Sequence, residues 1–162
     1  MLTHEQLYEA VVEHFDAEMG RDLDGIIDTV TPDVEYHVKS PRYVDDPVPF
    51  GVTASAEGVR GLWINLYETF SDYQIEIDDV LTWPERNQAL ALVTITATPA
   101  EDFEGLPAGV PYTYSVAALC DYDDNAKMTK ETVYGNMAIV TWGIRRMHEF
   151  LAEKAAAGVE SE

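Results

Sequence analysis

The chain of 162 residues has few basic side chains: 10 lysines and arginines stand against 30 aspartates and glutamates, which gives a formal net charge of -20. Such an excess of negative charge repels phosphate, so nucleic acid and anionic membrane surfaces are not expected partners. No apolar run is long enough to cross a bilayer, and the N-terminus lacks a basic and then apolar signal segment. The single cysteine, Cys120, excludes an internal disulfide and favours a cytoplasmic location.

The sequence also lacks the motifs of metal and cofactor enzymes. It has no glycine-rich phosphate loop and no Rossmann fingerprint, and its four histidines are not spaced as a zinc site requires. Residues 121–125 are acidic but lack the glycine and the distal glutamate of a calcium loop, so they predict a hairpin turn. No Gly-x-Ser-x-Gly elbow is present. We therefore expect no metal and no cofactor, and any catalysis would be acid/base chemistry in a pocket.

Two strand-like runs within residues 110–136 flank that turn and predict a long β-hairpin. In the first run Tyr112, Tyr114 and Cys120 share one face, and Asp121 lies on the other. Both faces carry apolar residues, so we expect one face to meet helices and the other to line a pocket. Isolated polar groups are the candidates for chemistry in such a pocket: Asp121, Glu131, Tyr134 and Asn136.

The spacing of apolar residues predicts helices over 3–20, 22–30, 57–70 and 137–157, the first opened by a capping box. Alternation predicts strands over 34–38, 73–81 and 88–98 besides the hairpin, and the proline-rich residues 40–55 predict a long loop. Helices in the first part of the chain and antiparallel strands in the second part are typical of an α+β fold. In such a fold we expect a strongly curved sheet that wraps around the first and third helices and leaves an apolar hollow between its concave face and the helices. We expect a single domain over 1–150, with 151–162 as the frayed end of the last helix.

Five segments occur in this order along the chain: Asp22-Leu-Asp-Gly-Ile26, Pro32-Asp-Val-Glu-Tyr36, Glu57-Gly-Val-Arg-Gly-Leu62, Phe70-Ser-Asp-Tyr73 and Lys127 to Asn136. In this order they resemble the SnoaL-like polyketide cyclase family of the nuclear transport factor 2-like superfamily. That resemblance implies a cystatin-like α+β cone, with a curved mixed or antiparallel sheet around N-terminal helices and a C-terminal helix. It also implies a homodimer and a cofactor-free enzyme that cyclises, isomerises or dehydrates a hydrophobic carbonyl compound. The alternative is a non-catalytic module that binds a ligand or dimerises.

The chain departs from the family at the residues expected to carry the chemistry. The family's acid/base aspartate at the end of the last strand is matched by Asn136, which can donate a hydrogen bond but cannot take a proton. The base of the related ketosteroid isomerases falls at Val38, beside His37, and their oxyanion-binding tyrosine falls near His14 or Phe15. Neither catalytic set is carried over intact.

Two residues remain as candidate bases: His37, if its strand turns inward, and Asp121, if it faces the hollow, where desolvation would raise its pKa. Tyr36, Tyr134 and Asn136 are candidate donors to a developing oxyanion, although Tyr36 and His37 alternate, so that both could serve only with a bulge. The competing interpretation is packing, with His14 as a half-buried structural residue and the aromatic residues as core. The candidates for substrate binding are His14, Phe15, Trp63, Tyr112 and Tyr114.

Overall fold

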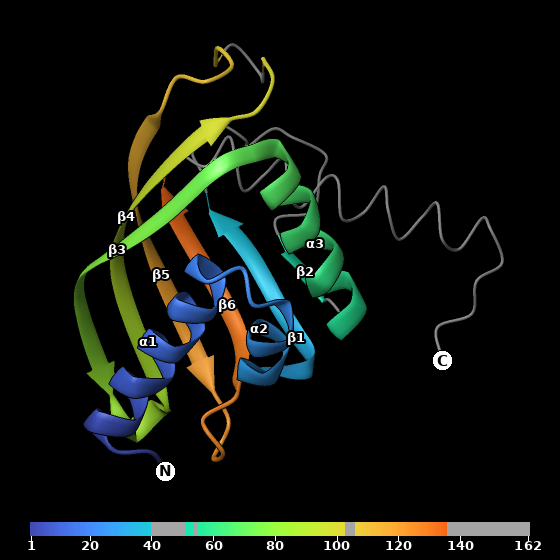
Figure 1. Cartoon of the computed structure of the whole chain (residues 1–162). Coiled ribbons are helices and arrows are strands. Elements are labelled where there is room, and N and C mark those ends of the chain that lie inside the picture. The colour runs from blue at the N-terminus through green and yellow to red at the C-terminus, as the bar shows by residue number, and fades with distance from the viewer. Residues whose placement is uncertain (40–50, 54, 103–105, 136–162) are drawn as a thin grey trace, which may run out of the picture.

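The computed structural model describes residues 1–39, 51–53, 55–102 and 106–135 (Figure 1). Asn136, most of the proline-rich segment and the helix predicted over 137–157 lie outside the described residues. The helices are α1 (His4–Met19), α2 (Leu23–Thr29) and α3 (Ala56–Thr69), with a 3-10 turn, η2, at Pro84–Arg86. The strands are β1 (Val30–Lys39), β2 (Gly51–Thr53), β3 (Phe70–Trp83), β4 (Gln88–Pro99), β5 (Tyr112–Tyr122) and β6 (Met128–Gly135).

Local side-chain bonds fix where the helices begin. Thr3 and Gln6 form a reciprocal capping box at the start of α1, which confirms the predicted start. Asp22 caps α2 and Ser55 caps α3, each by accepting a hydrogen bond from the backbone N–H three residues later. Because these bonds satisfy the amides that the first turn leaves unpaired, each helix begins within a residue or two of the predicted position.

The described strands form one mixed sheet in the order β2-β1-β6-β5-β4-β3. Strand β1 pairs in parallel with β6, and the other neighbours are antiparallel. The hairpin predicted over 110–136 is confirmed as β5 and β6. The loop predicted over 40–55 is wrong at residues 51–53, because β2 pairs with the edge of β1 there and satisfies its backbone groups. The α+β fold with a strongly curved sheet is confirmed.

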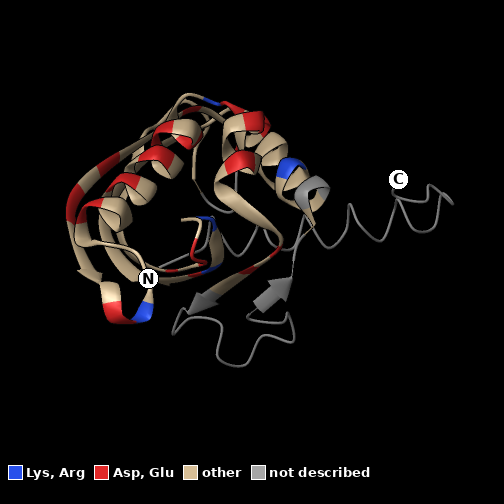
Figure 2. Ribbon diagram, turned by 90° about the horizontal axis from the view of Figure 1, so that it is seen from below, with Lys and Arg blue, Asp and Glu red and all other residues tan. Residues whose placement is uncertain are grey.

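The core lies between the helices and the inner face of the sheet, which curves beneath them (Figure 2). Alternate residues of β4 and β5 are buried, as the period of a strand requires. Three of the inward residues of β4 are alanines, and α1 packs against β4 as well as β3. Leu7, Val11 and Phe15 supply the apolar stripe of α1, and each such side chain stabilises the fold by about 1.5–3 kcal/mol.

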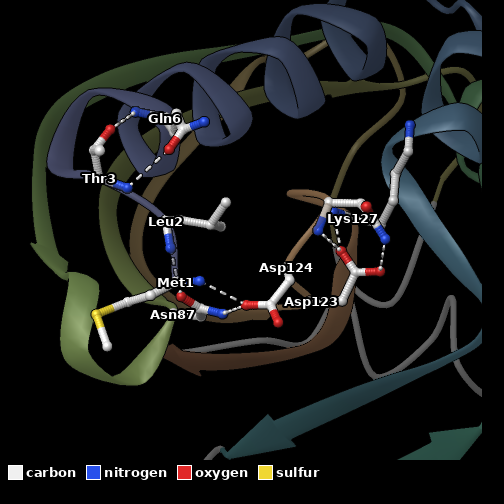
Figure 3. Close-up of polar contacts among 9 residues, drawn as sticks. Met1, Leu2, Thr3, Gln6, Asn87, Asp123, Asp124 and Lys127 are labelled. Atoms are coloured by element: carbon white, nitrogen blue, oxygen red, sulfur yellow. Dashed lines mark hydrogen bonds and ion pairs between the residues drawn. The ribbon is translucent and has the colours of Figure 1, made fainter.

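A polar network fixes the start of α1 to the turns at one end of the sheet (Figure 3). The side chain of Asn87 accepts a hydrogen bond from the backbone N–H of Leu2 at 2.9 Å and donates one to Asp124 at 3.0 Å. The ammonium group of Met1 lies 2.9 Å from Asp124. Asn87 has a φ of 50°, a left-handed conformation that asparagine tolerates well. Among the described helices, none is both long and apolar enough to span a membrane.

Candidate functional site

Three titratable side chains are buried together under α1. His14, Glu18 and Glu131 are only 1 %, 3 % and 7 % exposed. Charged residues are rarely buried to this extent unless they are paired, because removing an ionised group from water costs several kcal/mol. Such a cluster in a small domain therefore needs either complete pairing or a functional explanation.

His14 is held from both sides. Its Nδ1 lies 2.6 Å from the hydroxyl of Thr29, the last residue of α2, and Thr29 donates a hydrogen bond to the carbonyl of Ile26 at 2.7 Å. Its Nε2 lies 2.9 Å from Oε1 of Glu18, one turn further along α1. This second contact is an ion pair without the alignment of a hydrogen bond, so Nε2 has no well-aligned partner within the described part of the chain.

Glu131 lies on the inner face of β6, between Tyr36 on β1 and Cys120 on β5. Burial raises the pKa of the Glu131 carboxyl from 4.5 to about 7; the negative charge of Glu18 adds to the rise and His14 opposes it. No hydrogen bond to this carboxyl is present among the described residues. Glu131 is therefore a buried carboxyl that changes its charge near neutral pH.

The three groups act on one another. Burial lowers the pKa of His14, but the charge and contact of Glu18, together with the charge of Glu131, outweigh it, so the net pKa of His14 is raised. Burial raises the pKa of Glu18, and His14 opposes that rise. With all three ionised, the cluster would carry a net charge of -1 in a medium of low dielectric constant. One additional proton removes that charge, which is why the carboxyls hold protons more tightly than usual.

Several hydrogen-bond donors on the same side of the sheet have no partner. The hydroxyl of Tyr36 and the indole N–H of Trp63 are buried without one in the described part of the chain, as are the hydroxyls of Tyr114 and Tyr122. Burial raises the pKa of each of these three tyrosines, so their hydroxyls stay protonated at neutral pH and can donate. Most buried polar atoms in proteins are paired, so this group of unpaired atoms indicates a place where a ligand's acceptors could bind.

Two of these hydroxyls have polar neighbours that do not satisfy them. Tyr114 lies near the hydroxyl of Tyr73, and Tyr122 lies near the thiol of Cys120, but neither contact has the geometry of a hydrogen bond. The ring of Tyr73 also meets Trp63 edge-on, with the centroids 6.1 Å apart. The aromatic residues of α3 and the sheet thus form an apolar wall beside the buried carboxyls.

The candidate bases that the sequence suggested do not lie in this cluster. His37 and Glu35 lie on the outer face of β1, with Nε2 of His37 2.9 Å from the Glu35 carboxylate. Asp121 also lies on the outer face, where Gln88 donates a hydrogen bond to it. Tyr36 faces inward, as its parity with Val34 predicts. The bulge in β1 falls before Glu35, so it does not bring His37 and Tyr36 to the same face.

The other candidate residues also divide between the outer face of the sheet and the buried core. Tyr134 is 44 % exposed on the outer face, and Asn136 lies outside the described residues. Four of the five residues proposed for substrate binding are buried in the core, and Tyr112 is half-buried and stacks on Tyr114 with the centroids 5.4 Å apart. The expectation that His14 is half-buried is wrong, because α2 covers its Nδ1 side and Glu18 covers its Nε2 side. The four buried residues are His14, Phe15, Trp63 and Tyr114.

Glu18 of the cluster and Thr29, the hydrogen-bond partner of His14, were not predicted from the sequence. The signal for Glu18 is its position four residues after His14 and seven after Val11, which puts it on the apolar stripe of α1. Glu131 was noted only as a polar group in the hairpin. Its direction follows from the pairing of β6 with Cys120, which depends on a register shift in the hairpin between Asp121 and Tyr122.

Comparison with known proteins identifies the family to which the chain belongs. Residues 11–131 match the family model of the SnoaL-like domain. No curated protein matches the chain. Similar solved structures include AclR of Streptomyces galilaeus, a proposed hydroxylase, at 19% identity over 89% of this chain and 87% of that one, with a TM-score of 0.64. IdmH of Streptomyces antibioticus, a proposed polyketide cyclase, is 17% identical over 86% and 99%, with a TM-score of 0.67.

A third structure, TerC co-crystallised with polyporic acid, is 14% identical over 86% of this chain and 98% of that one, with a TM-score of 0.64. Identities this low show a shared fold and leave the chemistry open. The family match, by contrast, covers most of the chain and includes His14, Glu18 and Glu131. The chain therefore belongs to the SnoaL-like family.

Proposed function

We propose that this chain is a cofactor-free acid/base enzyme that acts on a hydrophobic carbonyl compound by aldol cyclisation, isomerisation or dehydration. The observation that carries the proposal is Glu131, a buried carboxyl without a hydrogen-bond partner among the described residues and with a pKa of about 7. A general base is most effective when its pKa is close to the working pH, because it is then both available and strong enough to take a proton.

In the proposed reaction Glu131 takes a proton from the carbon next to the carbonyl group of the substrate. The negative charge that develops on the carbonyl oxygen accepts hydrogen bonds from unpaired hydroxyls, of which Tyr36 is the nearest along the sheet to Glu131. Donors that are already desolvated and fixed stabilise such a charge strongly. Trp63 and Tyr112 would contact the apolar body of the substrate.

The comparisons support a small molecule as substrate. IdmH is a proposed polyketide cyclase, and TerC was crystallised with polyporic acid. The unpaired donors of this chain complement a compound that carries several oxygen acceptors. These observations favour an oxygenated, largely apolar carbonyl compound over a charged metabolite.

The experiment that tests the proposal is proton exchange at carbon. Polyketide, steroid and terpenoid ketones are incubated with the protein in deuterated water, and loss of the α-proton signal is followed by NMR. We expect Glu131→Gln to slow exchange by about 100-fold or more. Glu76→Gln, which makes the same change on an exposed position of β3, is the matched control and should exchange at the wild-type rate.

The same assay tests the alternative bases. His37→Ala and Asp121→Ala should both retain exchange, because the two side chains lie on the outer face of the sheet. If either of these variants loses exchange while Glu131→Gln keeps it, the proposal for Glu131 is wrong and the earlier candidate is the base. If no ketone is exchanged, the non-catalytic ligand-binding module becomes the better interpretation.

A homodimer through the outer face of the sheet is also proposed. Leu81, Leu92 and Tyr134 are 45 %, 37 % and 44 % exposed there, and a second copy of the chain would cover them. Light scattering that gives the mass of a monomer would refute this. We also propose a single domain to residue 150 and a cytoplasmic location, which the one buried thiol of Cys120 suits.

A further inference from the structure

We infer that Thr29 is a positioning residue: it fixes a proton on Nδ1 of His14, so that Nε2 and Glu18 share a second proton, which the pair can give to a ligand. The inference concerns the state of His14 in the free protein. Its use in a reaction rests on the proposed function.

The hydroxyl of Thr29 determines which way the hydrogen bond to His14 runs. At the end of α2 the backbone N–H of Val30 bonds to Ile27, which leaves the carbonyl of Ile26 without its usual helical donor. The Thr29 hydroxyl donates to that carbonyl at 2.7 Å. A hydroxyl has a single proton, so toward His14, at 2.6 Å, it can only accept. Nδ1 of His14 must therefore carry a proton.

A fixed proton on Nδ1 leaves two arrangements in which the pair has no net charge. Either Nε2 also carries a proton and faces a Glu18 carboxylate, or Nε2 is bare and Glu18 is a carboxylic acid. In both arrangements the pair holds one further proton, on one of two groups whose atoms Nε2 and Oε1 lie 2.9 Å apart. Because Nε2 has no well-aligned partner among the described residues, the proton of the pair is available to an acceptor oxygen of a ligand.

Groups from five other elements surround the pair. Glu131 of β6 is the other carboxyl, and its charge and that of Glu18 act on each other. The remaining titratable groups that feel the charge of Glu18 are neutral phenols and the thiol, and the hydroxyl of Tyr67 donates to the backbone carbonyl of Glu18 at 2.6 Å. Those groups are Tyr36 of β1, Tyr67 of α3, Tyr73 of β3 and Tyr114, Cys120 and Tyr122 of β5.

This arrangement supplies both partners of an enolisation. The Glu131 carboxylate takes the proton from the α-carbon, and the electrons of that C–H bond form the carbon–carbon double bond of the enol. As negative charge develops on the carbonyl oxygen, that oxygen takes the proton that the His14–Glu18 pair holds, so the enol that forms is neutral. When the enol reverts or isomerises, its O–H proton returns to the pair, and Glu131 gives its own proton to carbon. When the enol carbon instead forms a bond to a second carbonyl carbon, the O–H proton again returns to the pair, and Glu131 gives its proton to the new alkoxide oxygen.

The state of His14 is measured by nitrogen NMR of the wild-type protein labelled with ¹⁵N-histidine. The chain has four histidines, and the signals that disappear in His14→Gln belong to His14. We expect Nδ1 to remain protonated between about pH 6 and 9, with titration confined to Nε2. A bare Nδ1 with the proton on Nε2 in this range would overturn the inference. The measurement needs no substrate.

Two variants of Thr29 test its role. Thr29→Val keeps the shape and removes the hydroxyl, so a bare Nδ1 signal should appear and substrate exchange should slow about tenfold or more with little change in KM. Thr29→Ser keeps the hydroxyl and should restore both. Equal effects of valine and serine would contradict the positioning role. The expected wild-type spectrum combined with no exchange of any ketone would support the fixed proton and remove the proposed function.

Discussion

Replacing Glu131 with glutamine should change how the stability of the protein depends on pH. The pKa of the Glu131 carboxyl is about 7 in the folded protein, against an ordinary value of 4.5. The folded state therefore binds this proton more tightly than the unfolded chain does. The contribution to stability is complete below about pH 4.5 and is lost as the pH rises through about 7, so wild-type stability falls over this window.

The magnitude follows from the size of the shift. Each pKa unit corresponds to about 1.4 kcal/mol, so the ionised carboxyl costs up to about 3 kcal/mol of stability above pH 7. Glutamine has nearly the same shape and no charge. Glu131→Gln should therefore be more stable than wild type by up to about 3 kcal/mol at pH 8, and the difference should shrink toward zero below pH 5.

The assay is urea unfolding at a series of pH values, because urea adds no ionic strength. The net charge of -20 also makes any protein of this composition less stable at high pH through general repulsion. Glu76→Gln removes the same charge from an exposed position of β3 and corrects for that effect. If the two variants gain the same stability at pH 8, Glu131 is ionised without a burial penalty, and the reasoning about the buried cluster is refuted.

Three further substitutions have expected outcomes. Tyr36→Phe removes a buried hydroxyl without a partner, so it should leave the unfolding free energy unchanged or raise it by about 1 kcal/mol in urea titrations, while it slows α-proton exchange. Thr29→Val leaves Nδ1 of His14 buried without a hydrogen-bond partner and should lower that free energy by about 1–3 kcal/mol, more than Thr29→Ser does. Asn87→Ala strains a left-handed residue and removes the acceptor for Leu2, so calorimetry should show a lower Tm; unchanged Tm would contradict this.

Much of the fold could be predicted because it is determined locally. The capping residues Thr3, Asp22 and Ser55 bond within three residues of themselves, so the starts of the helices are visible in the sequence. The alternation along β5 likewise predicts which residues share a face. The short strand β2 could not be predicted, since its pairing with β1 is a tertiary contact and its sequence resembles a loop.

The candidate site was harder to predict for a related reason. Asp121 and Glu131 both appear as polar residues in strand-like runs, and only the register of the hairpin shows that Glu131 faces inward opposite Cys120 while Asp121 faces outward. The contact between His14 and Thr29 joins two helices, α1 and α2, and neither helix's sequence predicts how the two pack together. Glu18 was not predicted either, although its spacing from His14 is a local feature of α1 that the sequence shows.

The polar residues of the candidate site lower the stability of the protein, because they occupy buried positions where apolar residues would pack at a lower cost. An apolar residue in place of Glu131 would avoid the desolvation of a carboxyl, and phenylalanine in place of Tyr36 would avoid an unpaired hydroxyl. The burial of the apolar stripe of α1 and of the inner face of β4, whose buried residues are all apolar, offsets these costs. A ligand whose oxygens accept from the unpaired donors would remove part of the cost on binding. The same residues that lower the stability of the empty protein therefore favour the complex, as expected for a preorganised acid/base site.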